Sequence, residues 1–214
     1  MTVGGLLLIG GGGHALSVAD SLDCEVFISI GIIDCCDAET NSLPFPLVGE
    51  DSDLPALFDE GYRNAFITIG SVGDTDIRVR LYDRVVQIGY KIINIVDATD
   101  GVSRSVTMAT GIYIGNGAVI NAESDIGNMA IINTRAVVEH QCRIGEFVHI
   151  APGAILCGNV SVGAHSHIGA GCVVRQGISI GENTTVGIGS VVTRDIGPNV
   201  VAFGNPCRVV HKKG

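Results

Sequence analysis

Tryptophan is absent from the 214-residue sequence, aromatic residues make up only 5% of it and charged residues 16%. A core of stacked aromatic rings is therefore excluded, and aliphatic side chains must fill the interior. The shortage of charged residues also excludes a coiled coil, whose surface is rich in them. Hydrophobic residues account for 46% of the chain, which excludes intrinsic disorder and suffices for one large domain or two small ones.

Basic clusters are missing as well. Lys and Arg number 13 against 22 Asp and Glu, a net charge of −9, which argues against a nucleic-acid partner. The apolar run at 6–9 is too short to span a membrane and lacks a basic flank, so we expect no membrane span and a cytoplasmic protein. The seven cysteines form no CxxC pair, which fits small buried thiols in a reducing compartment better than disulfides or zinc.

Glycine, by contrast, is in excess, at 30 of 214 positions. Much of it belongs to a six-residue period in which every sixth residue is aliphatic. The series is Val102, Met108, Ile114, Ile120, Ile126, Ile132, Val138, Ile144, Ile150, Leu156, Val162, Ile168, Val174, Ile180, Val186 and Val192. Small side chains precede most of these by two positions, and glycine follows directly at 115, 127, 145, 163, 169, 181 and 187. This is the hexapeptide-repeat pattern.

A six-residue unit suits a short extended stretch with one large and one small inward side chain, followed by a turn whose backbone glycine tolerates. Three units close a triangular coil of eighteen residues, and stacked coils pair as parallel strands about 4.8 Å apart. Sixteen units therefore make just over five coils, a prism roughly 25 Å long. Residues 101–214 are predicted to form this parallel β-helix.

Residues 1–100 show a different pattern, in which short apolar runs alternate with amphipathic stretches. Strands are expected at 6–9, 26–34, 65–70 and 91–96, and helices at 14–22, 53–60 and 76–88. This alternation predicts a small parallel α/β sheet of the Rossmann type. The boundary between the two domains falls near 97–101.

A glycine turn at 10–13, with His14 at the start of the following helix, offers backbone N–H groups and the positive end of a helix to a phosphate. Asp34 ends the next strand, at the edge of the sheet where such folds bind ligands. The full dinucleotide pattern is missing, and the domain is too short for a second mononucleotide half. A single nucleotide is therefore the expected ligand, and a tight turn without any ligand is the alternative.

Histidines provide the candidate chemistry of the prism. His140 lies on a turn two residues after Val138 and therefore faces outward, where a neutral imidazole can act as a general base near pH 7. His149 and His167 are eighteen residues apart and should stack on neighbouring coils. A metal pair there would lack a third ligand, because positions 131 and 185 of that column are Ile and Thr, so no metal is expected.

Four features together resemble the sugar acetyltransferases that include the sialic acid O-acetyltransferases and the bacterial nucleotide-amino-sugar N-acetyltransferases. They are the Gly-Gly-His turn at 12–14, the Glu139–His140 motif within an uninterrupted prism, the segment 144–154, and the closing Gly-Asn-Pro at 204–206. The resemblance covers essentially the whole chain. It implies a left-handed β-helix, an acetyl-CoA-dependent acyltransferase of glycan biosynthesis, and a homotrimer with active sites between neighbouring prisms.

The resemblance also implies roles for particular residues. His140 is the catalytic base. Acetyl-CoA is expected at His149, near its thioester, and along the backbone of Gly158, Ala170 and Ile188. The nucleotide of the acceptor is expected at Gly12, Gly13, His14, Asp34 and Cys35, with Gly70 closing that pocket. Residues 1–100 are thus predicted to bind the nucleotide sugar, and residues 101–214 to form the acetyltransferase domain.

Two positions depart from the family. An acidic residue usually follows the catalytic histidine, but this chain has Gln141, which can orient an imidazole and cannot stabilise an imidazolium as an anion would. Glu123, eighteen residues earlier in the same column, is the candidate to supply that carboxylate, and a solvated turn glutamate is the alternative. Cys35 stands where relatives tend to carry a second Asp, which bears on base or sugar specificity.

The sequence thus predicts direct acetyl transfer from acetyl-CoA to the amino group of a nucleotide-linked (UDP or GDP) amino deoxy sugar. A covalent intermediate is not expected, because the repeat points Cys142 inward. A phosphate-binding turn favours a nucleotide-linked acceptor over a free sugar. O-acetylation of a sialic-type sugar is the alternative reaction. A nucleotide-sugar-binding scaffold without activity and a metal-dependent enzyme of the carbonic anhydrase type are alternatives of other classes.

Overall fold

The computed structural model describes residues 4–34, 43–99 and 101–213. The chain divides into two compact units, an α/β unit (Met1–Gly70 and Asp76–Ile95) and a β-helix unit (Ser71–Thr75 and Val96–Gly214). The change at Val96 comes a few residues before the division after residue 100 that the sequence predicts. The segment Ser71–Thr75, which we call the strap, belongs by its contacts to the β-helix unit, although it joins two elements of the α/β unit.

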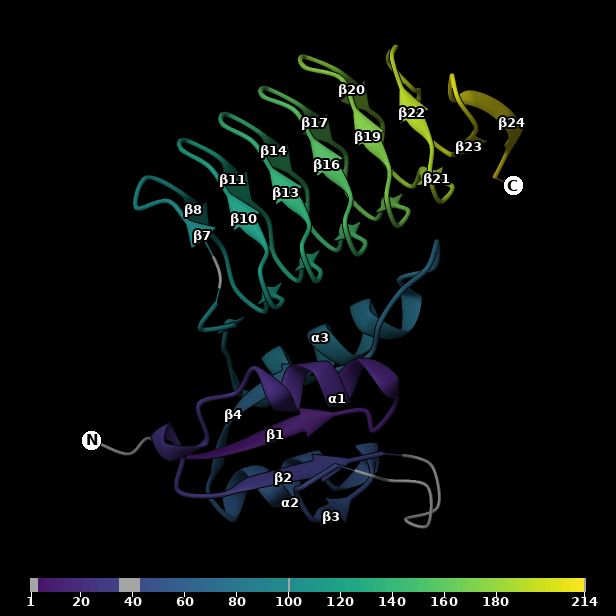
Figure 1. Ribbon diagram of the computed structural model, residues 1–214. Coiled ribbons are helices and arrows are strands. Elements are labelled where there is room, and N and C mark those ends of the chain that lie inside the picture. The colour runs from purple at the N-terminus through teal and green to yellow at the C-terminus, as the bar shows by residue number, and fades with distance from the viewer. Residues whose placement is uncertain (1–3, 35–42, 100, 214) are drawn as a thin grey trace. The chain divides into compact units, whose positions relative to one another are not determined.

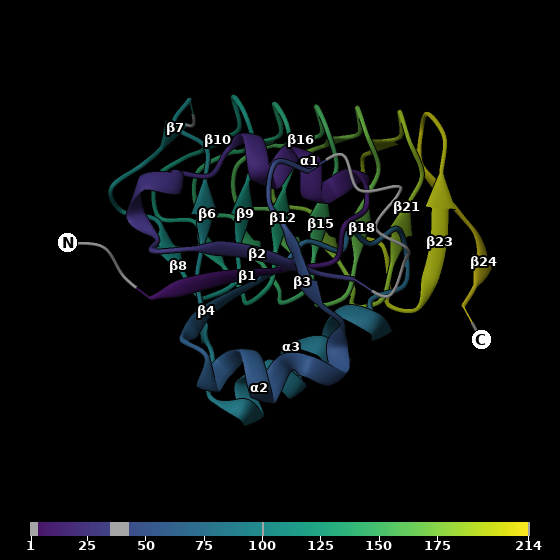
Figure 2. The ribbon, with the colours of Figure 1, turned by 90° about the horizontal axis from the view of Figure 1, so that it is seen from below.

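The α/β unit contains a five-stranded parallel sheet with the strand order β3-β2-β1-β4-β5. Its strands are β1 Gly5–Ile9, β2 Ile30–Ile33, β3 Leu47–Gly49, β4 Tyr62–Ile67 and β5 Lys91–Ile92. Its helices are α1 Gly13–Asp20, α2 Leu54–Asp59 and α3 Asp76–Ile88, with short 3₁₀ turns at Cys24–Val26 and Asp51–Asp53. Figure 2 shows α1 on one face of the sheet and α2 and α3 on the other. Since both faces are covered, the central strand β1 is buried along its whole length.

The predicted parallel α/β sheet is confirmed, and α3 has the predicted bounds 76–88. Other bounds differ. The expected strand 65–70 is β4, which runs from Tyr62 to Ile67, and α1 and α2 end one or two residues earlier than expected. The strand β3 was not predicted, because a three-residue strand preceded by two prolines gives no periodic signal. The expected strand 26–34 begins only at Ile30, and the expected strand 91–96 is two strands, since β6 (Ile95–Val96) pairs in the β-helix unit. Within the described ranges, no helix has the length and apolar character needed to cross a membrane.

The β-helix unit consists of three parallel sheets built from strands of mostly two residues, and its successive coils follow one another from left to right in Figure 1. Sheet I contains β7 Gly101–Val102, β10 Val119–Ile120, β13 Val137–Val138, β16 Ile155–Leu156, β19 Val173–Val174 and β22 Val191–Val192. Sheet II contains β8 Thr107–Met108, β11 Asp125–Ile126, β14 Arg143–Ile144, β17 Ser161–Val162 and β20 Ser179–Ile180. Sheet III contains β6, β9 Tyr113–Ile114, β12 Ile131–Ile132, β15 His149–Ile150, β18 His167–Ile168, β21 Thr185–Val186, β23 Val200–Phe203 and the antiparallel β24 Arg208–Lys212.

The predicted inward positions form the core of this unit. All the aliphatic positions from Ile114 onward are buried. In the first coil, Val102 is half-buried and Met108 is 36% exposed, because β7 and β8 end their sheets and that coil stacks on one neighbour only. The small residues two positions earlier are buried as expected. They are Ala118, Ser124, Ala130, Ala136, Cys142, Ala154, Ser166, Cys172, Thr184 and Ser190.

The sequence suggests that glycine follows the aliphatic positions because the turn needs its conformation, but the structure gives a different reason. The residue with positive φ lies two positions after this place in the repeat, as Gly171 (φ 65°) and Gln141 (φ 60°) do. A Cβ at Gly127 would lie 2.7 Å from the backbone nitrogen of Glu146, and one at Gly145 would lie 2.6 Å from that of Ala164. These glycines are therefore required by the close approach of the next coil rather than by their dihedral angles.

The two kinds of glycine predict opposite responses to substitution. Gly145→Ala should lower the free energy of unfolding by about 1–3 kcal/mol, because the added methyl meets backbone that cannot move aside. Gly171→Asn is the control. It sits at φ 65° in open space, and Asn tolerates that conformation, so a change within about 0.5 kcal/mol is expected. Denaturant unfolding measures both, and equal stability of the two variants would contradict this explanation.

Candidate active site

The glycine turn after β1 is fixed by polar contacts from two neighbouring strands. Gly10 has φ 107°, and the Gly11 N–H donates to the Asp34 Oδ2 at 2.5 Å. The Thr68 hydroxyl, which follows β4, donates to the Gly10 carbonyl at 2.5 Å. Asp34 was predicted to lie here from its place after β2, whereas Thr68 was not predicted, because a single threonine after a strand carries no recognisable signal.

Within the described ranges, the start of α1 has no side-chain cap. Gly12 is the N-cap residue, no side-chain hydrogen bond caps the helix there, and the first turn contains no acidic residue. A Cβ added at Gly12 or Gly13 would meet no heavy atom of the described residues within 4 Å. The orphan N–H groups and the positive end of the helix dipole are therefore available to an anion from solvent. Glycine at these two positions therefore leaves room for a ligand, whereas glycine in the β-helix avoids a clash with the next coil.

Two more residues that were predicted to bind the nucleotide of the acetyl acceptor, His14 and Gly70, lie beside this turn. A Cβ at Gly70 would come 3.7 Å from the Cβ of His14, which is ordinary van der Waals contact. Asp34, Gly12, Gly13, His14 and Gly70 are thus brought to the same edge of the sheet. Cys35, the remaining predicted residue, lies outside the described residues.

A second cluster lies at the corner between sheets I and II. His140 is exposed on the turn between β13 and β14, and Gly158 occupies the same place one coil further on. A Cβ at Gly158 would lie 2.5 Å from both Cε1 and Nε2 of His140. The imidazole therefore lies directly over Gly158, in space that exists because this residue has no side chain. Among the described residues, the Gly158 N–H donates to no backbone carbonyl.

Glu123 and Gln141 lie in one column on neighbouring coils, as the eighteen-residue count predicts. The Gln141 Nε2 donates to Glu123 Oε2 at 3.1 Å, across one coil. Both residues have φ 60° and are exposed at the same corner as His140. The Glu123 carboxylate thus contacts Gln141 from the preceding coil. It makes no such contact with the His140 imidazole. Its effect on His140 stays a prediction.

Cys142 lies two residues from His140 and faces the interior. It is fully buried, and its thiol donates to the Cys157 carbonyl at 3.3 Å. Burial raises the pKa of this thiol, so it remains protonated and poorly nucleophilic near neutral pH. This geometry agrees with a transfer that needs no covalent enzyme intermediate.

His149 and His167 stack in sheet III as the sequence predicts, with ring centroids 4.9 Å apart, edge to face. His149 is 8% exposed, and its two ring nitrogens contact the Ser71 carbonyl and the Asn133 side chain. Burial, with smaller effects of His149 and Lys213, lowers the pKa of His167 to about 4, so that ring is neutral at pH 7. The described residues contain no group of three side chains that could hold a metal ion. The predicted contact of His149 with the thioester stays a prediction.

Ala170 and Ile188, predicted for the pantetheine groove, lie on a different edge of the prism. Both occupy turns between sheets III and I, where Ile188 is 80% exposed and the Ala170 carbonyl accepts from the Gly189 N–H at 2.8 Å. The structure thus brings Ala170 and Ile188 into one column and His140 and Gly158 into another, without joining the two within one β-helix. Sheet I separates them.

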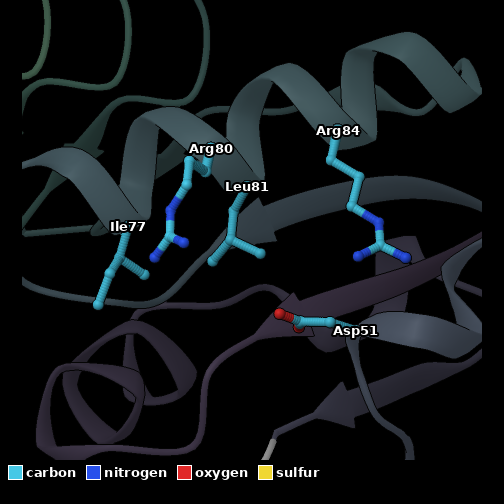
Figure 3. Close-up of a pocket in the computed structure, with 5 residues that line it drawn as sticks. All are labelled: Asp51, Ile77, Arg80, Leu81 and Arg84. Atoms are coloured by element: carbon cyan, nitrogen blue, oxygen red, sulfur yellow. The ribbon is translucent and has the colours of Figure 1, made fainter.

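A separate pocket of about 220 Å³ lies in the α/β unit, lined by Asp51, Ile77, Arg80, Leu81 and Arg84. Figure 3 shows Arg80 and Arg84 on the same side of α3, with Arg84 extending toward Asp51. None of the predicted site residues lines this pocket.

Coils of hexapeptide units with an exposed histidine at one corner define the class of hexapeptide acyltransferases. A model of the bacterial transferase hexapeptide repeat matches residues 141–176, and a model of the PglD N-terminal domain matches residues 5–85. The chain is similar over 99% of both lengths, at 38% identity and a TM-score of 0.89, to a GDP-perosamine N-acetyltransferase from Caulobacter crescentus, solved with CoA and GDP-perosamine after mutation of a histidine to alanine.

A second relative is the acetyltransferase domain of PglB from Neisseria gonorrhoeae, solved with acetyl coenzyme A. It is 30% identical over 96% of this chain and 98% of its own, with a TM-score of 0.89. WeeI from Acinetobacter baumannii shares the fold at 22% identity and a TM-score of 0.85. The chain therefore belongs to the nucleotide-amino-sugar N-acetyltransferase family, and it is an acetyl-CoA-dependent acyltransferase. The expected left-handed β-helix after a Rossmann-like domain is confirmed.

The packing of His140 on Gly158 predicts a specific loss of function. Gly158→Ala should displace the imidazole and lower kcat/KM for acetyl transfer by roughly tenfold or more, because small errors in position are costly in catalysis. The unfolding midpoint should change little, since an exposed side chain moves and not the coil. The control is a double-mutant cycle, in which Gly158→Ala adds no further loss to His140→Ala. Additive losses would show that Gly158 acts independently of His140.

Proposed function

We propose that the chain transfers the acetyl group of acetyl-CoA to the amino group of a nucleotide-linked amino deoxy sugar, with His140 as general base. The observation that carries this proposal is the exposed His140 imidazole, which lies over Gly158, whose N–H donates to no backbone carbonyl of the described residues. Relatives that bind CoA and GDP-perosamine, similar over nearly the whole chain, support both substrates.

Direct transfer requires four elementary events. The neutral amine attacks the thioester carbonyl carbon, and the carbonyl oxygen gains negative charge that the Gly158 N–H is placed to stabilise. His140 removes the proton that the nitrogen must lose. The carbon–sulfur bond then breaks, and the protonated His140 can return the proton to the leaving thiolate. Cys142 takes no part, because it is buried and protonated.

The acceptor is held at the α/β unit in this proposal. The uncapped start of α1 suits the diphosphate of a nucleotide sugar, because a phosphate can accept from several N–H groups where no side chain intervenes. Asp34 orders this turn through the Gly11 N–H, and its second carboxylate oxygen would accept from a hydroxyl or base donor of the ligand. A free sugar would not need such a site, which favours a nucleotide-linked acceptor over the sialic-type sugar of an O-acetyltransferase.

The test is a thiol-release assay with acetyl-CoA and a panel of UDP- and GDP-linked amino sugars. Wild-type protein should turn over at least one of them, and His140→Ala should reduce turnover by about 10²–10⁴-fold while the fold is retained. A control with the corresponding hydroxyl sugars separates N- from O-acetylation. A His140→Ala variant within threefold of wild type would remove this residue from the mechanism. Nucleotide-sugar binding without any turnover would indicate a scaffold.

We further propose a homotrimer with active sites between neighbouring prisms. The outward positions of sheet I form an aliphatic ladder of Val119, Val137, Ile155, Val173 and Val191, of which Ile155 is 38% exposed and Val173 37%. Sheet II presents Thr107, Asp125, Arg143, Ser161 and Ser179 at the equivalent positions. Sheet I is flanked by the His140 corner and by the Ala170 corner. Contacts at sheet I would therefore place one chain's His140 beside a groove on its neighbour.

An acidic residue introduced into the aliphatic ladder of sheet I tests whether the protein is a trimer. Ile155→Asp should dissociate the assembly and abolish acetyl transfer, because three carboxylates would be buried near the interface. Ser161→Asp, at the outward position of the next strand in sheet II, is the matched control and should remain trimeric and active. Analytical ultracentrifugation measures the mass. A wild-type protein that is active as a monomer would contradict this part of the proposal.

Finally, we place the reaction in the cytoplasm and in glycan biosynthesis. This assignment is supported by the two proposed substrates, acetyl-CoA and a nucleotide sugar.

A further inference from the structure

The pocket between α3 and the 3₁₀ turn Asp51–Asp53 lies wholly within the α/β unit. Arg80 and Arg84 lie on the same side of α3, with Leu81 between them, and Arg84 extends toward Asp51 (Figure 3). Ile77, one turn earlier on the helix, is 51% exposed and adds to an apolar wall. Since α3 covers the face of the sheet opposite α1 (Figure 2), the pocket is separate from the start of α1.

Positive charge is scarce in this part of the chain. The first 95 residues contain 14 acidic residues and five basic ones, Arg63, Arg78, Arg80, Arg84 and Lys91. Arg63 donates to the Phe58 carbonyl and lies over the Phe58 ring, and Arg78 is buried. Arg80 and Arg84 are exposed, and neither forms an ion pair or a hydrogen bond with any described residue. Like charges four residues apart destabilise a helix, so an anion bound at both side chains would relieve this repulsion.

Asp51 is the carboxylate that the 3₁₀ turn does not use for its own structure. Glu50 and Asp53 form a capping box, in which Asp53 Oδ2 accepts from the Glu50 N–H at 2.9 Å. Glu50 Oε1 also accepts from the Ser52 hydroxyl at 2.7 Å. Asp51 lines the pocket instead and accepts no hydrogen bond from the described residues. An ionised carboxylate can only accept, so a ligand beside Asp51 must present a donor such as a hydroxyl.

The size and chemistry of the pocket restrict its ligand. Its volume of about 220 Å³ is below the roughly 300–1,000 Å³ of most small-molecule sites, which is too small for a whole nucleotide sugar. Two guanidinium forks match the several oxygens and the double charge of a phosphate, whereas one fork already satisfies a carboxylate. The Asp51 charge would repel a bare phosphate ion but would accept from a hydroxyl of an organic phosphate. The apolar wall suits a carbon skeleton.

We propose that this pocket binds a small organic phosphate, such as a sugar phosphate. Arg80 and Arg84 donate to the phosphate oxygens, and Asp51 accepts from a hydroxyl of the organic part. The site is distinct from the proposed acceptor site, and the inference does not depend on the proposed function.

Titration calorimetry of the full-length protein with glucose 1-phosphate, inorganic phosphate and gluconate tests the recognition of the phosphate. Glucose 1-phosphate should bind more tightly than the other two. Arg80→Gln and Arg84→Gln should each weaken its binding about tenfold or more, because each loses charge-assisted hydrogen bonds. Lys91→Gln is the matched control. It removes the same charge from an exposed side chain outside the pocket and should bind as wild type does.

Asp51→Ala tests the recognition of the hydroxyl. Loss of the carboxylate removes a repulsive charge, so inorganic phosphate should bind at least as tightly as it does to wild type. Glucose 1-phosphate should lose its advantage over inorganic phosphate, because its hydroxyl no longer has an acceptor. Opposite changes for the two probes therefore separate a direct contact from a general effect of charge.

Hydrogen exchange locates the bound phosphate. Glucose 1-phosphate should slow the exchange of amides at 50–54 and 77–84 in wild type, and should not do so in Arg84→Gln. Protection confined to 10–14 would place the phosphate at the start of α1 instead and would overturn the inference. So would the absence of binding to wild type, equal affinity in wild type and both arginine variants, an equal loss in Lys91→Gln, or tighter binding of gluconate than of glucose 1-phosphate.

Discussion

An eighteen-residue register between successive coils determines where the side chains of the β-helix unit lie. Each strand from β10 to β19 pairs with residues eighteen positions before and after it, as Val138 does with Ile120 and Leu156. Parallel pairing sets the spacing of the coils at about 4.8 Å, so every column brings its members into contact. The three arrangements discussed above all follow from this register: Gln141 with Glu123, His140 over Gly158, and His149 against His167.

The same register explains how the β-helix fixes the position of the His140 ring. An exposed turn histidine would normally sample several rotamers, but the missing side chain of Gly158 creates a place for the ring on the next coil. The carboxylate of Glu123 reaches this corner from the coil on the other side, through Gln141. Whether this carboxylate takes the place of the acid that other members of the family are expected to carry beside the histidine stays a prediction.

Periodicity made much of this predictable. Counting by six identified the core, counting by eighteen predicted the contact of Glu123 with Gln141 and the His149–His167 stack, and the inward position of Cys142 followed from the same count. The reason why glycine directly follows the aliphatic positions was not predictable, because the close approach of Ala164 to Gly145 depends on how the coils stack in three dimensions. Nor was the strap, since an irregular segment that binds through its carbonyls has no side-chain pattern to read. In the α/β unit, strand β3 was missed for the same lack of pattern.

In the proposed reaction, His140 takes the proton from the acceptor amine. A crystal structure of the protein with CoA and a nucleotide-linked amino sugar tests this role, because it gives the distance from the amino nitrogen to the nearest ring nitrogen of His140. We expect a separation of about 2.6–3.2 Å, or one bridging water, with the imidazole still lying over Gly158. An amine bound beyond that reach, or beside a different basic side chain, would contradict it.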